Sequence, residues 1–562
     1  MPEQLTNNQV LLKECIKQDF DENSEYASLN DFFEFFASSQ ICKAYNLSDD
    51  EISSGIVGGS NDGGCDSIHV LLNGNLITAD QLDSIVAPRN SSLELLITQA
   101  KYTTSFKEDA VMKWKTVSEN LLDLNNSLSD YQSRYNQYVL DGFQLFRDLI
   151  ARTVRSQVSI KIRYSYVTIA NELHPNVIQQ SDELKCIVNR LFPSATIEVN
   201  FIDANKLFDL YNTGSDSTEE LNLIGSMVLT DKDYIGLVNV GTYFDFITDD
   251  SGRLIQVYFD SNVRDYQGHN IVNTSIAETL SDRTKQGDFW WFNNGVTILA
   301  SDIRLITQNK IIIKNPEIVN GQQTSREIFN YFTANPELKQ SEVRNVLVRI
   351  IKPNNEEARD QIIFATNNQT NIPKYSLRVT DAIHYQIEMY FKTRGLYYDR
   401  RKNFYRNQKK KNSDIIGVSF LAQCLISIIL RKPDFARARP STLLDDDITY
   451  NQLYSTSTNL EAYYKVACIG KLVKQHIKKD TNLSQIEKSD ILFALIYAMS
   501  RKLTKKDKIS FNDIQSIDLA ELTEDLLNDI KRSVLNIYKE LGANSTVAKS
   551  ASFTEEIDKV FA

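Results

Sequence analysis

The sequence predicts a multidomain α/β and α+β protein that ends in a helical region. Three observations support this fold class. Apolar strands alternate with helical stretches over residues 1–215, turn-rich strands with intervening helices follow over residues 216–411, and residues 412–562 show helical periodicity. We therefore expect an N-terminal α/β sandwich, a central domain built on a mixed sheet and a C-terminal helical region. A length of 562 residues accommodates three or four such units.

The composition argues against several classes of protein. With 62 basic and 73 acidic residues, the net charge of −11 disfavours a protein that coats nucleic acid without selectivity, although it is compatible with a local basic groove. The six cysteines form no CxxC pair, which predicts neither a zinc site nor a disulfide framework and fits a reducing cytoplasm. No signal peptide is evident, and the longest apolar run (420–430) is too short to span a bilayer. We expect a cytoplasmic protein without a membrane partner.

The elements of the first unit follow from the hydrophobic pattern. Residues 1–45 look helical, and the segment 31–41 places aromatic residues on both sides of Glu34. The boundary with the second unit falls in the polar stretch 212–220. Between them we expect strands at 66–72, 93–102, 159–170 and 195–203, and helices at about 106–152 and 174–192.

The most informative motif joins two of these strands. A glycine-rich turn, Asp-Gly-Gly-Cys at 62–65, delivers Asp66 into the first strand, and the second strand ends in Gln99-Ala100-Lys101. Side chains alternate along a strand, so Gln99 and Lys101 point the same way. Asp66 against that face gives a carboxylate, an amide carbonyl and an ammonium around one small volume. Such a set can hold Mg²⁺ and orient a water against a phosphodiester.

This arrangement resembles the PD-(D/E)xK nuclease superfamily, most closely its Mrr-type restriction endonucleases, over roughly residues 25–170. The resemblance implies that Asp66 and Gln99 bind Mg²⁺ or Mn²⁺ and that Lys101 orients or helps to deprotonate the attacking water. In such nucleases a helix glutamate upstream of the aspartate often joins the metal site. Glu34 could fill that role, or it could be a solvent-facing carboxylate on a core helix. Glu94 is a rival carboxylate, but seven residues from Lys101 it should face the other side of the strand.

Polar, glycine-bearing segments gather in the central unit, at 261–268, 290–300, 317–325 and 367–373. Carboxamides and hydroxyls both donate and accept hydrogen bonds, and glycine lets backbone N–H groups approach a ligand. Such loops could cradle phosphates or read base edges, or they could simply form hairpin turns. The candidate ligand-binding residues are Arg264, Asn293, Asn294, Asn320, Gln322, Gln323, Thr324 and Asn368.

These segments, FNNGVTILA, VNGQQTS and SNVRDYQG, resemble the AIPR family, which is named for abortive infection and phage resistance. The resemblance spans about 235–415 with helical sequence beyond. It implies a bacterial protein, and many members carry an Mrr-like segment at the N-terminus. VNGQQT is also similar to the DGQHR motif of DNA-modification-linked proteins with a ParB-like fold, some of which use nucleotides. Asn320 and Gln323 replace the acidic residue and the histidine of that motif, which leaves nucleotide hydrolysis open.

A basic run interleaved with aromatic residues lies at 394–411. Basic groups neutralise phosphates and aromatic faces stack on bases, so the run predicts contact with nucleic acid. The alternative is a solvated helix end or loop. The residues of the run proposed to bind nucleic acid are Arg400, Arg401, Lys402 and Arg406.

Two functions fit these features. The first is a metal-dependent DNA endonuclease acting in anti-phage defence, with a central domain that senses a nucleotide or phage-derived trigger or binds nucleic acid. The second is a non-catalytic sensor of a nucleotide or of modified DNA, whose nuclease segment has decayed. In either case we expect DNA as the partner, with RNA as an alternative, and a homo-oligomer.

Overall fold

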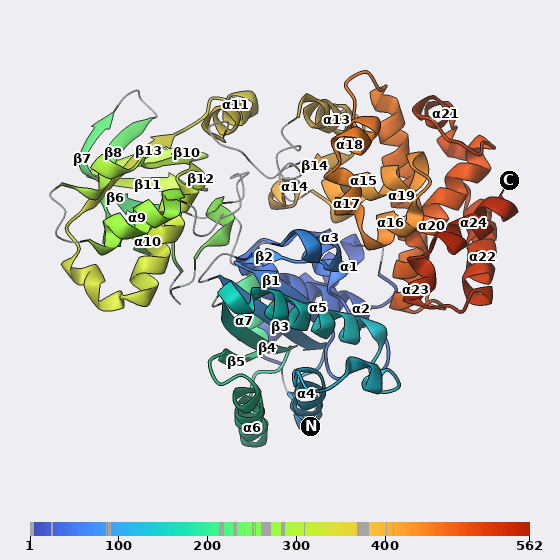
Figure 1. Ribbon diagram of the computed structural model, residues 1–562, viewed down its shortest axis with the longest axis horizontal. Helices are drawn as coiled ribbons and strands as arrows, with labels where there is room; N and C mark the ends of the chain where they lie inside the picture. The colour runs from blue at the N-terminus through green and yellow to red at the C-terminus, as the bar shows by residue number, and fades with distance from the viewer. Residues whose placement is uncertain are drawn as a thin grey trace.

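The computed structural model arranges the chain as three modules (Figure 1). The N-terminal module (blue to teal) lies below a central module (green to yellow) and a helical module (orange to red). The structure describes residues 5–23, 26–85, 87, 91–156, 158–212, 218–228, 233–249, 252, 254–259, 271–282, 287–307, 309–367, 381–400, 402–408 and 410–561.

A five-stranded mixed sheet forms the centre of the N-terminal module. Its strand order is β2-β1-β3-β4-β5, in which β1 pairs antiparallel with β3 while β3, β4 and β5 run parallel. The strands are β1 (Ser67–Leu72), β2 (Asn75–Leu76), β3 (Ser92–Lys101), β4 (Ser159–Thr168) and β5 (Thr196–Ile202).

Helices cover both faces of this sheet, because strand β3 is apolar on both of its faces. Leu95 and Ile97 enter the core on one side, whereas Leu96 and Ala100 enter the core on the other. The first core is closed by α4 (Glu108–Leu121), α5 (Gln137–Thr153) and α6 (Pro175–Leu191). The second is closed by α1 (Asn7–Glu22), α2 (Leu29–Ile41), α3 (Asp49–Ser54) and α7 (Ala204–Asn212).

The single helical stretch predicted at about 106–152 is wrong in its middle, where the chain turns between α4 and α5. Asp123 accepts a hydrogen bond from the backbone N–H of Asn125 at 2.9 Å and closes a turn. Asn136 caps α5 by accepting from the N–H of Val139 at 3.1 Å. Short polar side chains of this kind compete with helical hydrogen bonds and favour turns and caps.

The central module contains a second five-stranded sheet, of order β12-β9-β13-β8-β7, and a three-stranded sheet, β10-β11-β6. In the larger sheet β9 pairs antiparallel with β12 and parallel with β13. Its strands are β7 (Ile224–Val228), β8 (Tyr234–Asn239), β9 (Val296–Leu299), β12 (Glu317–Asn320) and β13 (Asn345–Ile351). The smaller sheet has β6 (Thr218–Asn222), β10 (Asp302–Thr307) and β11 (Lys310–Lys314), and the helices are α8 (Val240–Phe246), α9 (Ile271–Ser281), α10 (Gln322–Ala334) and α11 (Glu356–Asn367).

The helical module shares one hydrophobic core that begins at Ile383, ahead of the boundary predicted at residue 412. Helix α13 (Ala382–Lys392) and strand β14 (Tyr397–Asp399), which pairs with β15 (Ile415–Gly417), therefore belong to this module. Its longer helices are α15 (Val418–Ile429), α19 (Leu460–Lys478), α20 (Gln485–Thr504), α22 (Glu524–Glu540) and α24 (Ala551–Val560).

The apolar run at 420–430 forms most of α15, which is buried in the core of the helical module. Within the part of the chain that the structure describes, no helix has both the length and the apolar character needed to cross a membrane.

Candidate active site

A tight turn at residues 62–65 places Asp66 at the start of β1. Gly63 and Gly64 have φ of 63° and 83°, the left-handed region that favours glycine. The turn is closed by Asp62, whose carboxylate accepts from the N–H of Gly64 at 2.8 Å. The indole N–H of Trp114, on α4, donates to the carbonyl of Gly64 at 2.6 Å. The turn is therefore fixed both internally and to the helix behind it.

The strand register then brings Asp66 beside the end of β3. The N–H of Asp66 donates to the carbonyl of Thr98 at 2.8 Å, one step beyond the Ser67–Thr98 pair of the ladder. The Asp66 carboxylate is buried, with the residue 2% exposed, and it accepts from the N–H of Ala100 at 2.7 Å.

Two side chains of β3 complete this cluster. The carboxamide nitrogen of Gln99 donates to Asp66, and the ammonium of Lys101 lies 3.4 Å from the same carboxylate oxygen. Asp66, Gln99 and Lys101 thus meet on one side of the sheet, and Lys101, whose side chain is 46% exposed, opens the cluster to solvent.

Glu34 adds a second carboxylate to the cluster from α2. Burial and the charge of Asp66 raise the pKa of Glu34 to about 8, although Lys101 opposes the shift. Burial likewise raises the pKa of Asp66 to about 6, although Lys101 and the Ala100 N–H stabilise its ionised form and oppose the shift. Burial would lower the pKa of Lys101, but the negative charges of Asp66 and Glu34 outweigh it and the pKa is raised. Two carboxyl groups therefore share one ammonium, and at neutral pH Glu34 keeps its proton while Asp66 is largely ionised.

This donor set fits a hard divalent cation. Carboxylate and amide oxygens are the ligands that Mg²⁺ prefers, and an added positive charge would favour the ionised form of Glu34 beside Asp66. Among the described residues no group of three or more His, Cys, Asp or Glu side chains is placed to hold a metal. The carboxamide oxygen of Gln99 and the oxygens of a bound substrate would therefore have to contribute, and Gln99 would have to turn its carboxamide, because its nitrogen faces Asp66.

Glu94 lies outside the cluster, as the strand alternation predicts. Its carboxylate accepts from the hydroxyl of Tyr45 at 2.9 Å and pairs with Arg163 at 3.5 Å and with Lys161 at 3.9 Å. These partners satisfy Glu94 within a separate charged network.

The two glycine loops of the central module lie against each other. Asn293 closes the first by donating to the carbonyl of Phe289 at 2.7 Å and accepting from the N–H of Gly295 at 3.1 Å. A Cβ on Gly321, in the second loop, would come within 2.7 Å of the Gly295 carbonyl, so only glycine permits this approach. Asn293 thus has a turn-forming role, while Asn294 is exposed.

The second loop starts helix α10. Gly321, with φ of 92°, precedes the helix, and Gln322 and Thr324 are buried in its first turn. The side-chain oxygens of Gln322 and Gln323 are buried without a hydrogen-bond partner in the described structure. Asn320 ends β12 and is partly buried. Two predicted ligand-binding residues, Arg264 and Asn368, lie outside the described residues.

The basic run pairs with carboxylates of the same chain. Arg400 is buried against Glu388 at 3.0 Å. Lys402 and Arg406 reach across to the N-terminal module, where they pair with Glu51 and Asp49 of α3, each at 2.7 Å. Arg401 lies outside the described residues. A nucleic acid would have to displace these acidic partners before it could use the three described cations.

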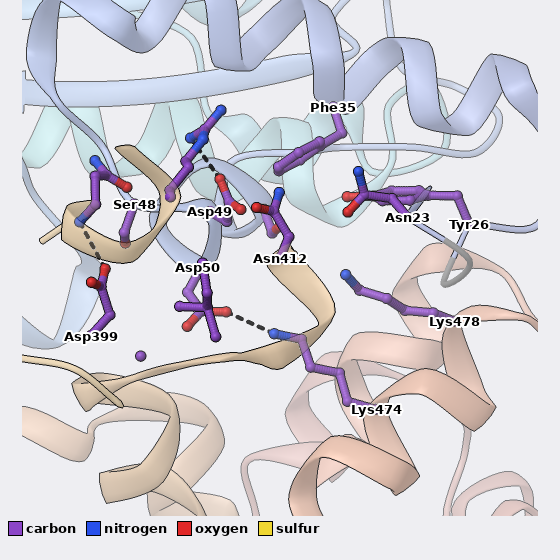
Figure 2. Close-up of a pocket in the computed structure, with 15 residues that line it drawn as sticks. Asn23, Tyr26, Phe35, Ser48, Asp49, Asp50, Asp399, Asn412, Lys474 and Lys478 are labelled. Atoms are coloured by element: carbon purple, nitrogen blue, oxygen red, sulfur yellow. Dashed lines mark hydrogen bonds and ion pairs between the residues drawn. The ribbon is translucent and has the colours of Figure 1, made fainter. Parts of the chain in front are cut away.

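Figure 2 shows a pocket at this junction, separate from the Asp66 cluster. Lys474, on α19, points to Asp50 of α3 and pairs with it at 2.7 Å. The pocket is also lined by Asp399, Asn412 and Lys478. The pocket is thus walled by acidic side chains of α3 and basic side chains of the helical module, and it marks where the two modules dock.

The fold and these sites define a mixed α/β protein of several modules, with a polar cluster of two carboxyl groups, an amide and a lysine at the carboxyl end of β3. A family model described as AIPR protein matches residues 259–548, more than half of the chain, and the chain belongs to this family. No curated protein and no solved structure matches it. The match covers most of the central module and the helical module but not the Asp66 cluster.

Proposed function

We propose that this chain is a bacterial anti-phage protein of the abortive-infection type that acts as a metal-dependent DNA endonuclease through Asp66, Gln99 and Lys101. Membership of the AIPR family supports the defence role. The observation that carries the nuclease assignment is the convergence of these three side chains at the end of β3, near the buried Glu34 carboxyl, whose pKa is shifted by the charges of Asp66 and Lys101.

The order of elements supports an Mrr-like PD-(D/E)xK assignment for the N-terminal module. A helix bearing Glu34 precedes β1, β3 ends in Gln-x-Lys, and a helical crossover leads to the parallel strand β4. The glycine turn and the strand register bring the motif residues together from positions more than 30 residues apart.

Asp66 and Gln99, with Glu34, would hold Mg²⁺ or Mn²⁺ in this centre. The metal supplies Lewis-acid polarisation of the phosphodiester and of the attacking water. Lys101 is protonated at neutral pH, because its pKa is raised, so its ammonium would orient the water and stabilise negative charge that develops on the phosphate. The Ala100 N–H fixes the Asp66 carboxylate in place.

The test is cleavage of plasmid DNA, phage DNA and RNA by the purified chain with Mg²⁺, Mn²⁺ or EDTA. We expect metal-dependent DNA cleavage that Lys101→Ala and Asp66→Asn abolish. Lys107→Ala is the matched control, because Lys107 is an exposed lysine at the start of α4 and should leave cleavage unchanged. Undiminished cleavage by purified Lys101→Ala protein would refute the nuclease assignment. Cleavage of RNA but not of DNA would show that the substrate is RNA.

A further inference from the structure

Three polar residues lie in one row across neighbouring strands of the central sheet. The register pairs Thr297 of β9 directly with Arg349 of β13, whereas Asn320 of β12 meets Thr297 across a register shift between Ile318 and Asn320. Residues paired directly across strands project from the same face of a sheet. The residues that alternate with them, such as Val296 and Val348, enter the core beneath α10. Thr297 and Arg349 therefore lie on the opposite face, beside the smaller hydrophobic cluster that Leu299 and Val319 form with Ile363 of α11.

Two atoms of this row are buried without a partner. Thr297 is 2% exposed, and its hydroxyl has no hydrogen-bond partner in the described structure. The Nε of Arg349 is also buried and unpartnered, and the guanidinium makes one hydrogen bond, from Nη2 to the carbonyl of Asn294 at 3.2 Å. By contrast, Arg359 on α11 is matched by the carboxylate of Glu317. Leaving the Thr297 hydroxyl and the Nε of Arg349 buried without a partner is unfavourable, so the pair suits a ligand that accepts hydrogen bonds from both.

The donors of the row suit a ligand that carries an oxyanion, and an exposed tryptophan of the same module suits a ligand that also carries a flat ring. The guanidinium of Arg349 and the hydroxyl of Thr297 donate hydrogen bonds of the kind that phosphate oxygens accept. Three residues before Asn294 stands Trp291, which is 62% exposed and offers an indole face for stacking. Its turn is fixed to β13, because the Asp288 carboxylate accepts from the backbone and side chain of Asn345 at 2.6 and 2.7 Å.

We propose that the central module binds a nucleotide at this row, with a phosphate on Arg349 and Thr297 and the base against Trp291. The site lies in a different module from the nuclease centre and does not depend on nuclease activity.

The test uses the full chain carrying Lys101→Ala, so that the nuclease cannot affect the result. Binding of ATP, GTP, CTP and UTP is measured by thermal melting and by titration of tryptophan fluorescence, with pyrophosphate and a short single-stranded oligonucleotide alongside. We expect at least one nucleotide to raise the melting temperature and bind saturably. Arg349→Gln should weaken that binding roughly tenfold or more. Arg304→Gln is the matched control, because Arg304 is an exposed arginine of β10 paired with Asp302.

Thr297→Val provides a second variant whose folding is not in question. Valine has nearly the same shape and removes a hydroxyl that has no partner, so the melting temperature without nucleotide should hold or rise. Nucleotide affinity should nevertheless fall several-fold. The proposal fails if no nucleotide binds at millimolar concentration, if both variants bind like the control, or if only the oligonucleotide binds. Pyrophosphate binding as tightly as the best nucleotide would overturn the stacking of a base on Trp291.

Discussion

Replacing Gly64 by alanine should disrupt the candidate active site, because the added Cβ would crowd the Gln99 side chain and helix α4. The new Cβ would lie 3.1 Å from Cβ of Lys113, 3.2 Å from Oε1 of Gln99 and 3.4 Å from the carbonyl of Ala110. Two of these atoms belong to α4 and cannot move alone, so the Gln99 side chain must give way. Alanine at φ of 83° adds about 1–2 kcal/mol of backbone strain, and the crowding adds about 1–3 kcal/mol more.

Gly59→Ala separates strain from crowding. Gly59 has a similar φ of 76°, but a Cβ there would meet nothing within 4 Å. We expect it to cost about 1–2 kcal/mol and to leave DNA cleavage intact. Gly64→Ala should cost about 2–5 kcal/mol and lose cleavage, because Gln99 can no longer hold Asp66.

The assay follows urea unfolding through the fluorescence of Trp114, which is buried and bonded to the Gly64 carbonyl. Replacing Trp290 and Trp291 by phenylalanine leaves Trp114 as the single indole of the chain, since the sequence has three tryptophans. A Gly64→Ala protein that is as stable as Gly59→Ala and cleaves DNA equally well would show that the crowding at Gly64 has no effect on the site.

Two further predictions concern charge. The folded-state pKa of Glu34, about 8, exceeds its ordinary value of 4.5. Between these pH values the folded chain keeps a proton that the unfolded chain has lost. The free energy of unfolding should therefore fall as pH rises from about 4.5 to about 8. Glu34→Gln should flatten that part of the stability curve, and Mg²⁺ should stabilise the parent protein more at pH 8 than at pH 5; equal curves for parent and variant would contradict the burial of this carboxylate. Exchanging the charges of Asp49 and Arg406 should restore stability that either single reversal removes, with a coupling of roughly 0.2–1 kcal/mol for this partly exposed pair that declines at high salt. A double-mutant cycle in urea measures it, and additive effects of the two reversals would show that the pair contributes nothing to docking.

The sequence predicts those features that depend on residues close together in the chain. The alternation of side chains along β3 predicts that Gln99 and Lys101 lie on one side of the strand and Glu94 on the other. The glycine turn predicts that Asp66 stands at the start of β1. The mixed α/β architecture and the buried helix at 420–430 likewise follow from local hydrophobic patterns.

What the sequence does not reveal depends on distant partners. Arg406 looks like a free cation in the basic run, but Asp49 lies 357 positions away and meets it only after folding. Thr297 and Arg349 sit in ordinary apolar strands, and only the register of β9 and β13 makes them neighbours. Trp114 gives no local sign that its indole supports the Gly64 turn.

The docking contacts also bear on the candidate active site. The charge of Asp66 helps to raise the pKa of Glu34, and the chain between the two residues includes α3. The helical module contacts α3 through two ion pairs, Lys474 with Asp50 and Arg406 with Asp49. Just before α3, the side chain of Asn46 accepts a hydrogen bond from Asn403 at 2.8 Å. Because these contacts restrain the segment that joins the two carboxyl groups, they help to hold the protonated Glu34 beside Asp66. The raised pKa of Glu34 therefore depends on the family-matched part of the chain as well as on the N-terminal module.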